Sequence, residues 1–126
     1  MEIYIATDLV RVGNSEEYNA VYAFKSMTSV RSYEKFCKAS GIDHRIVVTP
    51  AKVDCGFSTV NVVTEMETSG DMAKYRATKV FENWDDARDH VESVREEQPG
   101  IKAEHESVRI HSRFTPGILH IGWAEL

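Results

Sequence analysis

Three side chains that can carry positive charge recur at every second position near the end of the chain: Arg109, His111 and Arg113. Successive side chains of an extended strand point to opposite faces, so these three would share one face. The opposite, core-facing side would hold Val108, Ile110 and Phe114. Arginine offers a planar fork suited to phosphate or carboxylate, and histidine adds a donor whose charge depends on pH. The spacing therefore predicts an anion-binding strand face.

The same pattern also fits a solvent-exposed strand whose cations pair with acidic residues of a neighbouring helix, such as Asp89 and Glu92. Exposed ion pairs are common and contribute only about 0 to 1 kcal/mol each. The formal net charge of −5 opposes general adhesion to nucleic acid. We therefore expect no long nucleic acid as partner, whereas a small anionic, nucleotide-like ligand is compatible with this charge.

Phe81 and Asn83 stand at a predicted strand-to-helix junction, where unpaired backbone N–H groups and the positive helix end attract anions. An aromatic ring there could stack on a nucleobase. Phe81 and Trp84 fit the hydrophobic core as well, and Asp85 and Asp86 would compete with a ligand phosphate. Both interpretations of this junction stay open.

The elements that would position these residues predict one domain, residues 1–126, of the α+β class. Alternating or β-branched apolar residues predict strands over 2–12, 18–24, 44–49, 57–64, 72–81 and 101–114. Pro50 would end the third strand. Residues 65–71 would form a turn, so that 57–64 and 72–81 could pair as an antiparallel hairpin, while 18–24 would be either a continuation of the first strand or its hairpin partner. Helical spacing predicts a first helix that starts from a cap at Ser26, Thr28 or Ser29 and runs to Ala39, and a second that is capped by Asn83 and ended by Pro99. In the second helix the apolar stripe would hold Trp84, Ala87, Val91 and Val94.

We expect an antiparallel or mixed sheet with about two helices, a ferredoxin-like arrangement being one candidate, and no internal repeat. No window approaches the roughly 20 apolar residues of a membrane span, and the N-terminus lacks the features of a signal peptide. These features predict a cytoplasmic protein without membrane contact. The apolar segment Ile118–Trp123 would be a last strand or an edge that pairs with a second copy. A homo-oligomer would then bring several copies of Arg109 and Arg113 around one axis.

Five histidines occur without the spacing of a metal motif, and we expect neither a metal nor a cofactor. They are His44, His90, His105, His111 and His120. No Gly-rich phosphate loop, nucleophile elbow or paired carboxylates appear, so catalysis is not expected. Cys37, on a helical apolar stripe, would serve packing.

Cys55 precedes Gly56 in a predicted loop, as a reactive thiol often does. The segment Pro50–Phe57 resembles the proline-then-Cys-Gly segment of the putative selenium or sulfur carrier family, and the resemblance extends over roughly residues 19–63. Pro50, Cys55 and Gly56 carry over, which implies a thiol carrier with Cys55 as its carrier group. The chain departs from that family in its greater length and in Asp54, whose carboxylate disfavours a neighbouring thiolate.

The expected protein has an α+β fold without catalytic motifs, a cationic strand face and an apolar tail through which it associates with itself. In this general plan it is similar to one group of phage anti-defence proteins. These are the sponges that inhibit Thoeris defence by sequestering nucleotide immune signals. The residues compatible with such a site are Phe81, Asn83, Arg109, His111 and Arg113. The resemblance implies capture, in the host cytoplasm, of a cyclic ADP-ribose-type or cyclic oligonucleotide signal without cleavage. A module that binds a protein partner through its last strand is a further alternative.

Overall fold

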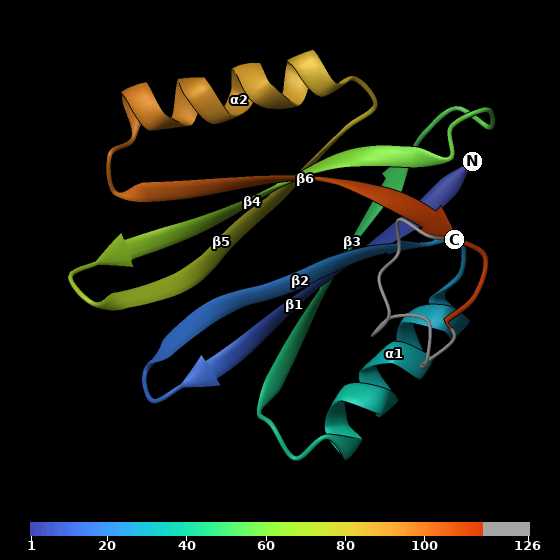
Figure 1. Ribbon diagram of the computed structural model, residues 1–126, viewed down its shortest axis with the longest axis horizontal. Coiled ribbons are helices and arrows are strands. Elements are labelled where there is room, and N and C mark those ends of the chain that lie inside the picture. The colour runs from blue at the N-terminus through green and yellow to red at the C-terminus, as the bar shows by residue number, and fades with distance from the viewer. Residues whose placement is uncertain (115–126) are drawn as a thin grey trace.

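Hairpins, helices and single strands alternate along the chain in the computed structural model, which describes residues 1–114 (Figure 1). The strands are β1 (Glu2–Val12), β2 (Ser15–Phe24), β3 (His44–Lys52), β4 (Thr59–Ser69), β5 (Met72–Phe81) and β6 (Ile101–His111). The helices are α1 (Met27–Ala39) and α2 (Trp84–Glu97). The predicted α+β class with two helices is confirmed for this part of the chain. The predicted strand Ile118–Trp123 lies outside the described residues.

The six strands form one mixed sheet in the order β3-β1-β2-β6-β4-β5. Neighbouring strands are antiparallel except β2 and β6, which pair in parallel only at Ala23↔Ile110 and Phe24↔His111. Because this junction is so short, the halves β1–β2–β3 and β4–β5–β6 turn toward each other and make the sheet barrel-like. A ferredoxin-like arrangement is not confirmed, since each helix here follows a hairpin.

The second half of the described chain repeats the first, which corrects the expectation of no internal repeat. Corresponding elements are all separated by 57 positions: they begin at Glu2 and Thr59, Ser15 and Met72, Met27 and Trp84, and His44 and Ile101. In each half the first strand lies between the other two. The same spacing relates the turn glycines Gly13 and Gly70, with φ of 62° and 61°, and the helix N-caps Ser26 and Asn83. The repeated unit is therefore a hairpin, a helix and a closing strand.

Two hydrophobic clusters hold these layers together. The larger lies between the two halves of the sheet and contains Ile3, Ile5, Val21, Ala23, Val53, Val60, Val62, Val108 and Ile110. The other joins α1 to the outer face of the first half and contains Ala6, Phe24, Val30, Tyr33 and Cys37. With α2 over the second half, the order of layers is helix, sheet, sheet, helix (Figure 1).

Two strands extend past their predicted C-terminal ends. β3 continues past Pro50 to Lys52, because it is an edge strand and a missing N–H costs little where there is no second neighbour. β4 continues through the predicted turn, with Glu65 buried in it, so only Gly70 and Asp71 make the turn. The predicted hairpin of β4 and β5 is otherwise confirmed. Of the two alternatives for residues 18–24, the structure has the hairpin, in which β2 pairs antiparallel with β1.

Ser26, one of the three candidate caps of the first helix, and Asn83, the predicted cap of the second, each accept a hydrogen bond from a backbone N–H in the first helical turn. The apolar stripe of α2 is correct for Ala87 and Val94, which are buried, but wrong for Trp84, which is 48% exposed. Neither described helix has the length and apolar character needed to cross a membrane.

Candidate functional site

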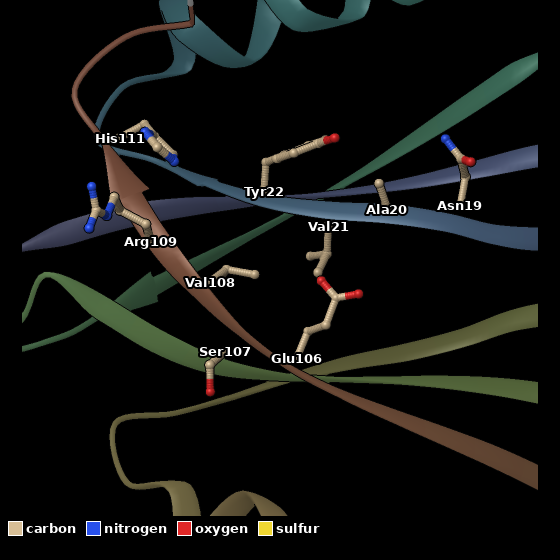
Figure 2. Close-up of a pocket in the computed structure, with 9 residues that line it drawn as sticks. All are labelled: Asn19, Ala20, Val21, Tyr22, Glu106, Ser107, Val108, Arg109 and His111. Atoms are coloured by element: carbon tan, nitrogen blue, oxygen red, sulfur yellow. The ribbon is translucent and has the colours of Figure 1, made fainter. Parts of the chain in front are cut away.

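The predicted anion-binding face lies partly beside a pocket of about 190 Å³, where β2 and β6 diverge from their short junction. Arg109 is exposed at this pocket, and Tyr22 and His111 project to the same side of the two strands (Figure 2). Val108 and Ile110 are buried, as predicted. The full lining is Asn19, Ala20, Val21, Tyr22, Glu106, Ser107, Val108, Arg109 and His111.

The alternation fails beyond His111, where β6 ends. Arg113 therefore lies outside the strand and does not line this pocket. Phe114 turns to the α1 side, with its ring 5.6 Å from that of Tyr33 and 5.4 Å from that of Phe36 between centroids. The predicted strand therefore extended past the real end of β6. Phe114 does contact the hydrophobic core, but it packs against the cluster beneath α1 and not against the one that contains Val108 and Ile110.

The charge of this pocket is smaller than the sequence suggests. Burial, with a contribution from the charge of Arg109, lowers the pKa of His111 to about 4, so the imidazole is neutral at pH 7. Glu106 lines the same pocket and brings a negative charge. Glu92 pairs with Arg88 at 3.3 Å, so it does not act as a counter-ion for β6. Arg109 is thus the only fixed cation among the described lining residues.

Phe81 and Asn83 lie elsewhere, at the α2 side of the second half-sheet. Phe81 stands opposite Asn61 of β4, and its ring is 5.5 Å from that of His90. The Asn83 side chain accepts the N–H of Asp85 at 2.7 Å as the helix cap. Neither residue lines the pocket beside Arg109. The five expected ligand-binding residues therefore do not share one pocket.

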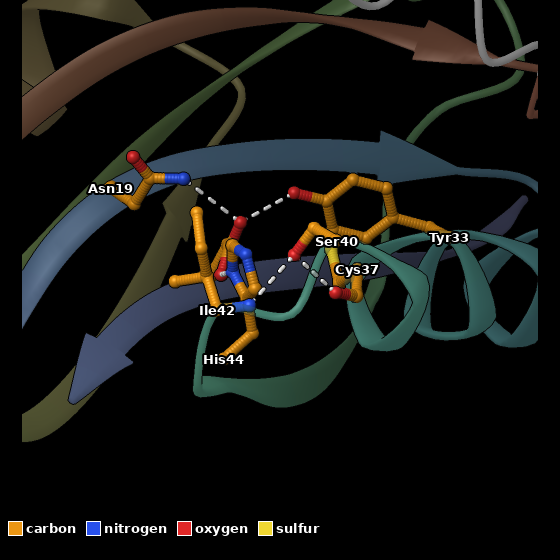
Figure 3. Close-up of polar contacts among 7 residues, drawn as sticks. Asn19, Tyr33, Cys37, Ser40, Ile42 and His44 are labelled. Carbon is orange, nitrogen blue, oxygen red and sulfur yellow. Dashed lines mark hydrogen bonds and ion pairs between the residues drawn. The ribbon is translucent and has the colours of Figure 1, made fainter.

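A buried carboxylate on β1 organises a second site, which the sequence did not reveal. Asp8 is 1% exposed. Its Oδ2 accepts the hydroxyl of Tyr33 at 2.6 Å and the amide of Asn19 at 3.0 Å, and its Oδ1 lies 2.7 Å from Nδ1 of His44. Burial and the bond to Asp8 raise the pKa of Tyr33, so its hydroxyl keeps the donated proton. These partners offset the cost of burying the carboxylate (Figure 3).

A β-bulge explains how Asn19 reaches this carboxylate. The pairing of β1 and β2 shifts from Asp8↔Ala20 to Leu9↔Tyr18, which leaves Asn19 as the extra residue of β2. Bulges redirect side chains and often lie next to functional sites. The irregularity thus brings an amide donor to Asp8.

The second half contains an equivalent carboxylate, Glu65, 57 positions after Asp8 and 4% exposed. It lies 2.8 Å from Nε2 of His90, which is equivalent to Tyr33, and 3.9 Å from Nε of Arg76. Arg76 is the extra residue of a matching bulge in β5. An acid in the central strand, bound by a helix residue and a bulge residue, is therefore a feature of the repeated unit.

A pocket of about 490 Å³ opens beside the Asp8 network. Tyr22, Tyr33 and Phe36 supply aromatic surface, and the full lining is Asp8, Asn19, Ala20, Tyr22, Tyr33, Phe36, Cys37, Ser40, Ile42 and His44. It shares Asn19, Ala20 and Tyr22 with the pocket beside Arg109. The two pockets therefore adjoin along β2.

The two cysteines occupy opposite environments. Cys37 is buried, as predicted, and burial is the main cause that raises the pKa of its thiol, which disfavours a nucleophilic thiolate. It also contributes to a cluster in which donor atoms of Asp8, Cys37 and His44 lie within 4.8 Å of one another. Cys55 is exposed in the loop between β3 and β4, and it lines neither of the two pockets.

Comparison of the chain with protein-family models, with curated proteins and with solved structures found no match. The case for a function therefore rests on the side chains of these two pockets.

One sequence signal could have indicated the second site. Asp8 interrupts an apolar strand between Thr7 and Leu9, and a charged residue in such a place needs partners when buried. Its partners Tyr33 and His44 come from a helix stripe and from the start of a strand. Nothing local in the sequence links them to Asp8.

Proposed function

We propose that this protein binds a small anionic, nucleotide-type ligand without catalysing a reaction on it. The observation that supports this best is the pair of adjoining pockets along Tyr22, with Arg109 at one end and aromatic surface at the other. A nucleotide combines a phosphate, which suits the guanidinium fork, with a flat base, which suits aromatic rings.

The sizes of the pockets favour a ligand that spans both. Pockets for small molecules commonly measure about 300–1,000 Å³. The pocket beside Asp8, at about 490 Å³, falls within this range, and the one beside Arg109, at about 190 Å³, is smaller. In the proposed complex the base stacks near Tyr22, the phosphate contacts Arg109, and the polar groups of Asn19 and His44 contact the sugar or the base edge.

Within this class we favour capture of a cyclic ADP-ribose-type or cyclic oligonucleotide signal, as the similarity to the phage sponges implies. Self-association is part of this proposal, since one Arg109 is a weak anion site and several copies could hold a multiply charged ligand. The protonated state of the Cys37 thiol favours binding over covalent chemistry.

A calorimetric screen of cyclic nucleotides, cyclic oligonucleotides and ADP-ribose derivatives tests this proposal. We expect binding of at least one ligand, recovered chemically unchanged by mass spectrometry. Arg109→Ala should weaken binding about 10-fold or more, because a charge-assisted hydrogen bond is lost, and the loss should shrink at high salt. Arg88→Ala, which removes an exposed arginine of α2, is the matched control and should bind normally. Failure of the whole set to bind, or recovery of altered ligand, would contradict the proposal.

The exposure of Cys55 favours a thiol carrier as the second candidate. Alkylation of the native protein, mapped by mass spectrometry, tests it with buried Cys37 as internal control. A carrier thiol should react faster at neutral pH than the same cysteine in the unfolded chain. Equal or slower alkylation of Cys55 would eliminate this function.

A further inference from the structure

The two halves of the molecule differ beside their buried acids: Glu65 has the imidazole of His90 near it, whereas Asp8 has the imidazole of His44 together with the thiol of Cys37. We propose that Asp8, Cys37 and His44 form a binding site for a zinc-type divalent transition-metal ion. Their donor atoms lie within 4.8 Å of one another and come from β1, α1 and β3. Asp8 and Cys37 are buried and His44 is mostly so.

The donor set suits zinc. Carboxylate oxygen, thiolate sulfur and imidazole nitrogen bind Zn²⁺ at about 2.0–2.3 Å, so donor atoms around one tetrahedral ion stand roughly 3–4 Å apart. The present spacing needs only small side-chain movements to reach this geometry. Zinc would displace the thiol proton of Cys37, which would pass to the solvent. His44 would bind as the neutral imidazole through Nδ1 and carry its single ring proton on Nε2.

The hydrogen bonds around Asp8 leave the appropriate atom for a metal. Tyr33 and Asn19 both donate to Oδ2, while Oδ1 faces His44 at 2.7 Å. Such hydrogen bonds to a ligating carboxylate fix its orientation. All three proposed ligands line the pocket of about 490 Å³, so the fourth coordination position would be open to water or to a bound molecule.

The repeat supplies an internal comparison for this site. The positions equivalent to Asp8, Cys37 and His44 are occupied by Glu65, Val94 and Ile101. The acid recurs because it binds the helix in both halves. Valine and isoleucine at the other two positions show that the unit folds without a thiol or an imidazole there. Cys37 and His44 are therefore not required by the architecture, which points to a local chemical role.

The charge balance favours a cation at the same place. Within residues 1–114 Asp8 forms no ion pair with lysine or arginine, and His44 is its only titratable basic contact. A divalent ion would neutralise the carboxylate and the thiolate together. This inference goes beyond the proposed ligand binding, since neither requires the other.

Metal titration of the full chain, stripped beforehand with a chelator, tests the site. We expect one Zn²⁺ per chain with micromolar or tighter affinity in competition with a chromophoric chelator. We also expect Co²⁺ to give a near-ultraviolet thiolate-to-cobalt band and tetrahedral visible bands. Absence of stoichiometric binding, or a cobalt complex without the thiolate band, would overturn the proposal.

Variants identify the ligands. Cys37→Val introduces the residue that the second half has at the equivalent position, so folding should survive, as circular dichroism can verify. It should abolish the thiolate band and weaken Zn²⁺ binding at least 10-fold, and His44→Gln should weaken it similarly. Cys55→Ser and His90→Gln are the matched controls and should change neither. Loss of the band in Cys55→Ser, or its persistence in Cys37→Val, would refute the assignment. Nucleotide binding measured in chelator reports on the proposed function separately.

Discussion

The hydroxyl of Tyr33 lies 2.6 Å from Oδ2 of Asp8, and this bond fastens α1 to the central strand of the first half-sheet. The acceptor is a buried charge, so loss of a donor leaves part of its desolvation uncompensated. The bond therefore stabilises the fold, and its two residues also line the pocket of about 490 Å³.

Tyr33→Phe should lower the free energy of unfolding by about 1.5–3 kcal/mol, the usual range for a hydrogen bond to a charged group. Urea denaturation at neutral pH measures the change. Tyr4→Phe is the matched control, because the Tyr4 hydroxyl donates a hydrogen bond to Glu2 at an exposed site, and this substitution should leave stability nearly unchanged. Equal effects of the two substitutions would show that the buried bond contributes little.

The depressed pKa of His111 predicts an acid-sensitive stability. The folded state resists protonation down to about pH 4, whereas the unfolded chain takes up the proton near pH 6.5. Stability from this group is thus complete above about pH 6.5 and is lost as pH falls toward 4. His111→Gln should lose less stability than the wild type over this interval in urea denaturation.

The same pKa can be measured directly. The imidazole resonances of His111 should titrate near pH 4 by nuclear magnetic resonance, and the midpoint should rise in Arg109→Ala, because the arginine charge lowers it. A midpoint near 6.5 in the wild type would contradict the burial of this ring.

The turn glycines predict equal costs in the two halves. Gly13 and Gly70 have φ near +60°, where a side chain is strained. Gly13→Ala and Gly70→Ala should each destabilise the protein by about 1–2 kcal/mol in thermal or urea unfolding. Gly100 does not have a positive φ, and no atom lies within 4 Å of where an added methyl group would be, so Gly100→Ala should leave the free energy of unfolding nearly unchanged. Clearly unequal costs at 13 and 70 would mean that the two turns are not equivalent.

Two aromatic residues should differ sharply in their importance for stability. Phe24 is fully buried in the cluster beneath α1, whereas Trp84 is 48% exposed at the start of α2. Phe24→Ala should cost about 3–5 kcal/mol and Trp84→Ala less than about 1 kcal/mol by urea denaturation. A large loss in Trp84→Ala would reveal that a further surface covers this ring.

Local signals in the sequence predicted the local structure well. The α+β class, the hairpin of β4 and β5 and the cap Asn83 follow from alternation, turn residues and capping chemistry, and Ser26 was among the candidate caps. Sheet order was not within reach, because the β2–β6 junction depends on Ala23 and Ile110, which are distant in the chain. Arg113 was misplaced because alternation does not show where a strand ends.

The structural repeat and the site around Asp8 could not be predicted from the sequence, for a related physical reason. Each half has a hydrogen bond between its helix and the buried acid of its central strand, made by Tyr33 with Asp8 and by His90 with Glu65. The type of contact therefore recurs although the amino acids at these positions differ. The cluster of Asp8, Cys37 and His44 is assembled only when three elements pack. Of these three residues, only Asp8 is unusual in the sequence itself, because it is a charged residue within an apolar strand.

The 57-residue repeat makes this molecule a covalently tethered counterpart of a homodimer. In a true homodimer each substitution appears in both subunits, so a change that improves a site in one subunit also alters the equivalent position in the other, where it can be destabilising. Tethering removes that constraint and lets the halves specialise. Half of this chain could keep Val94 and Ile101 for packing while the other gained Cys37 and His44, an asymmetry that no symmetric pair of identical chains can encode.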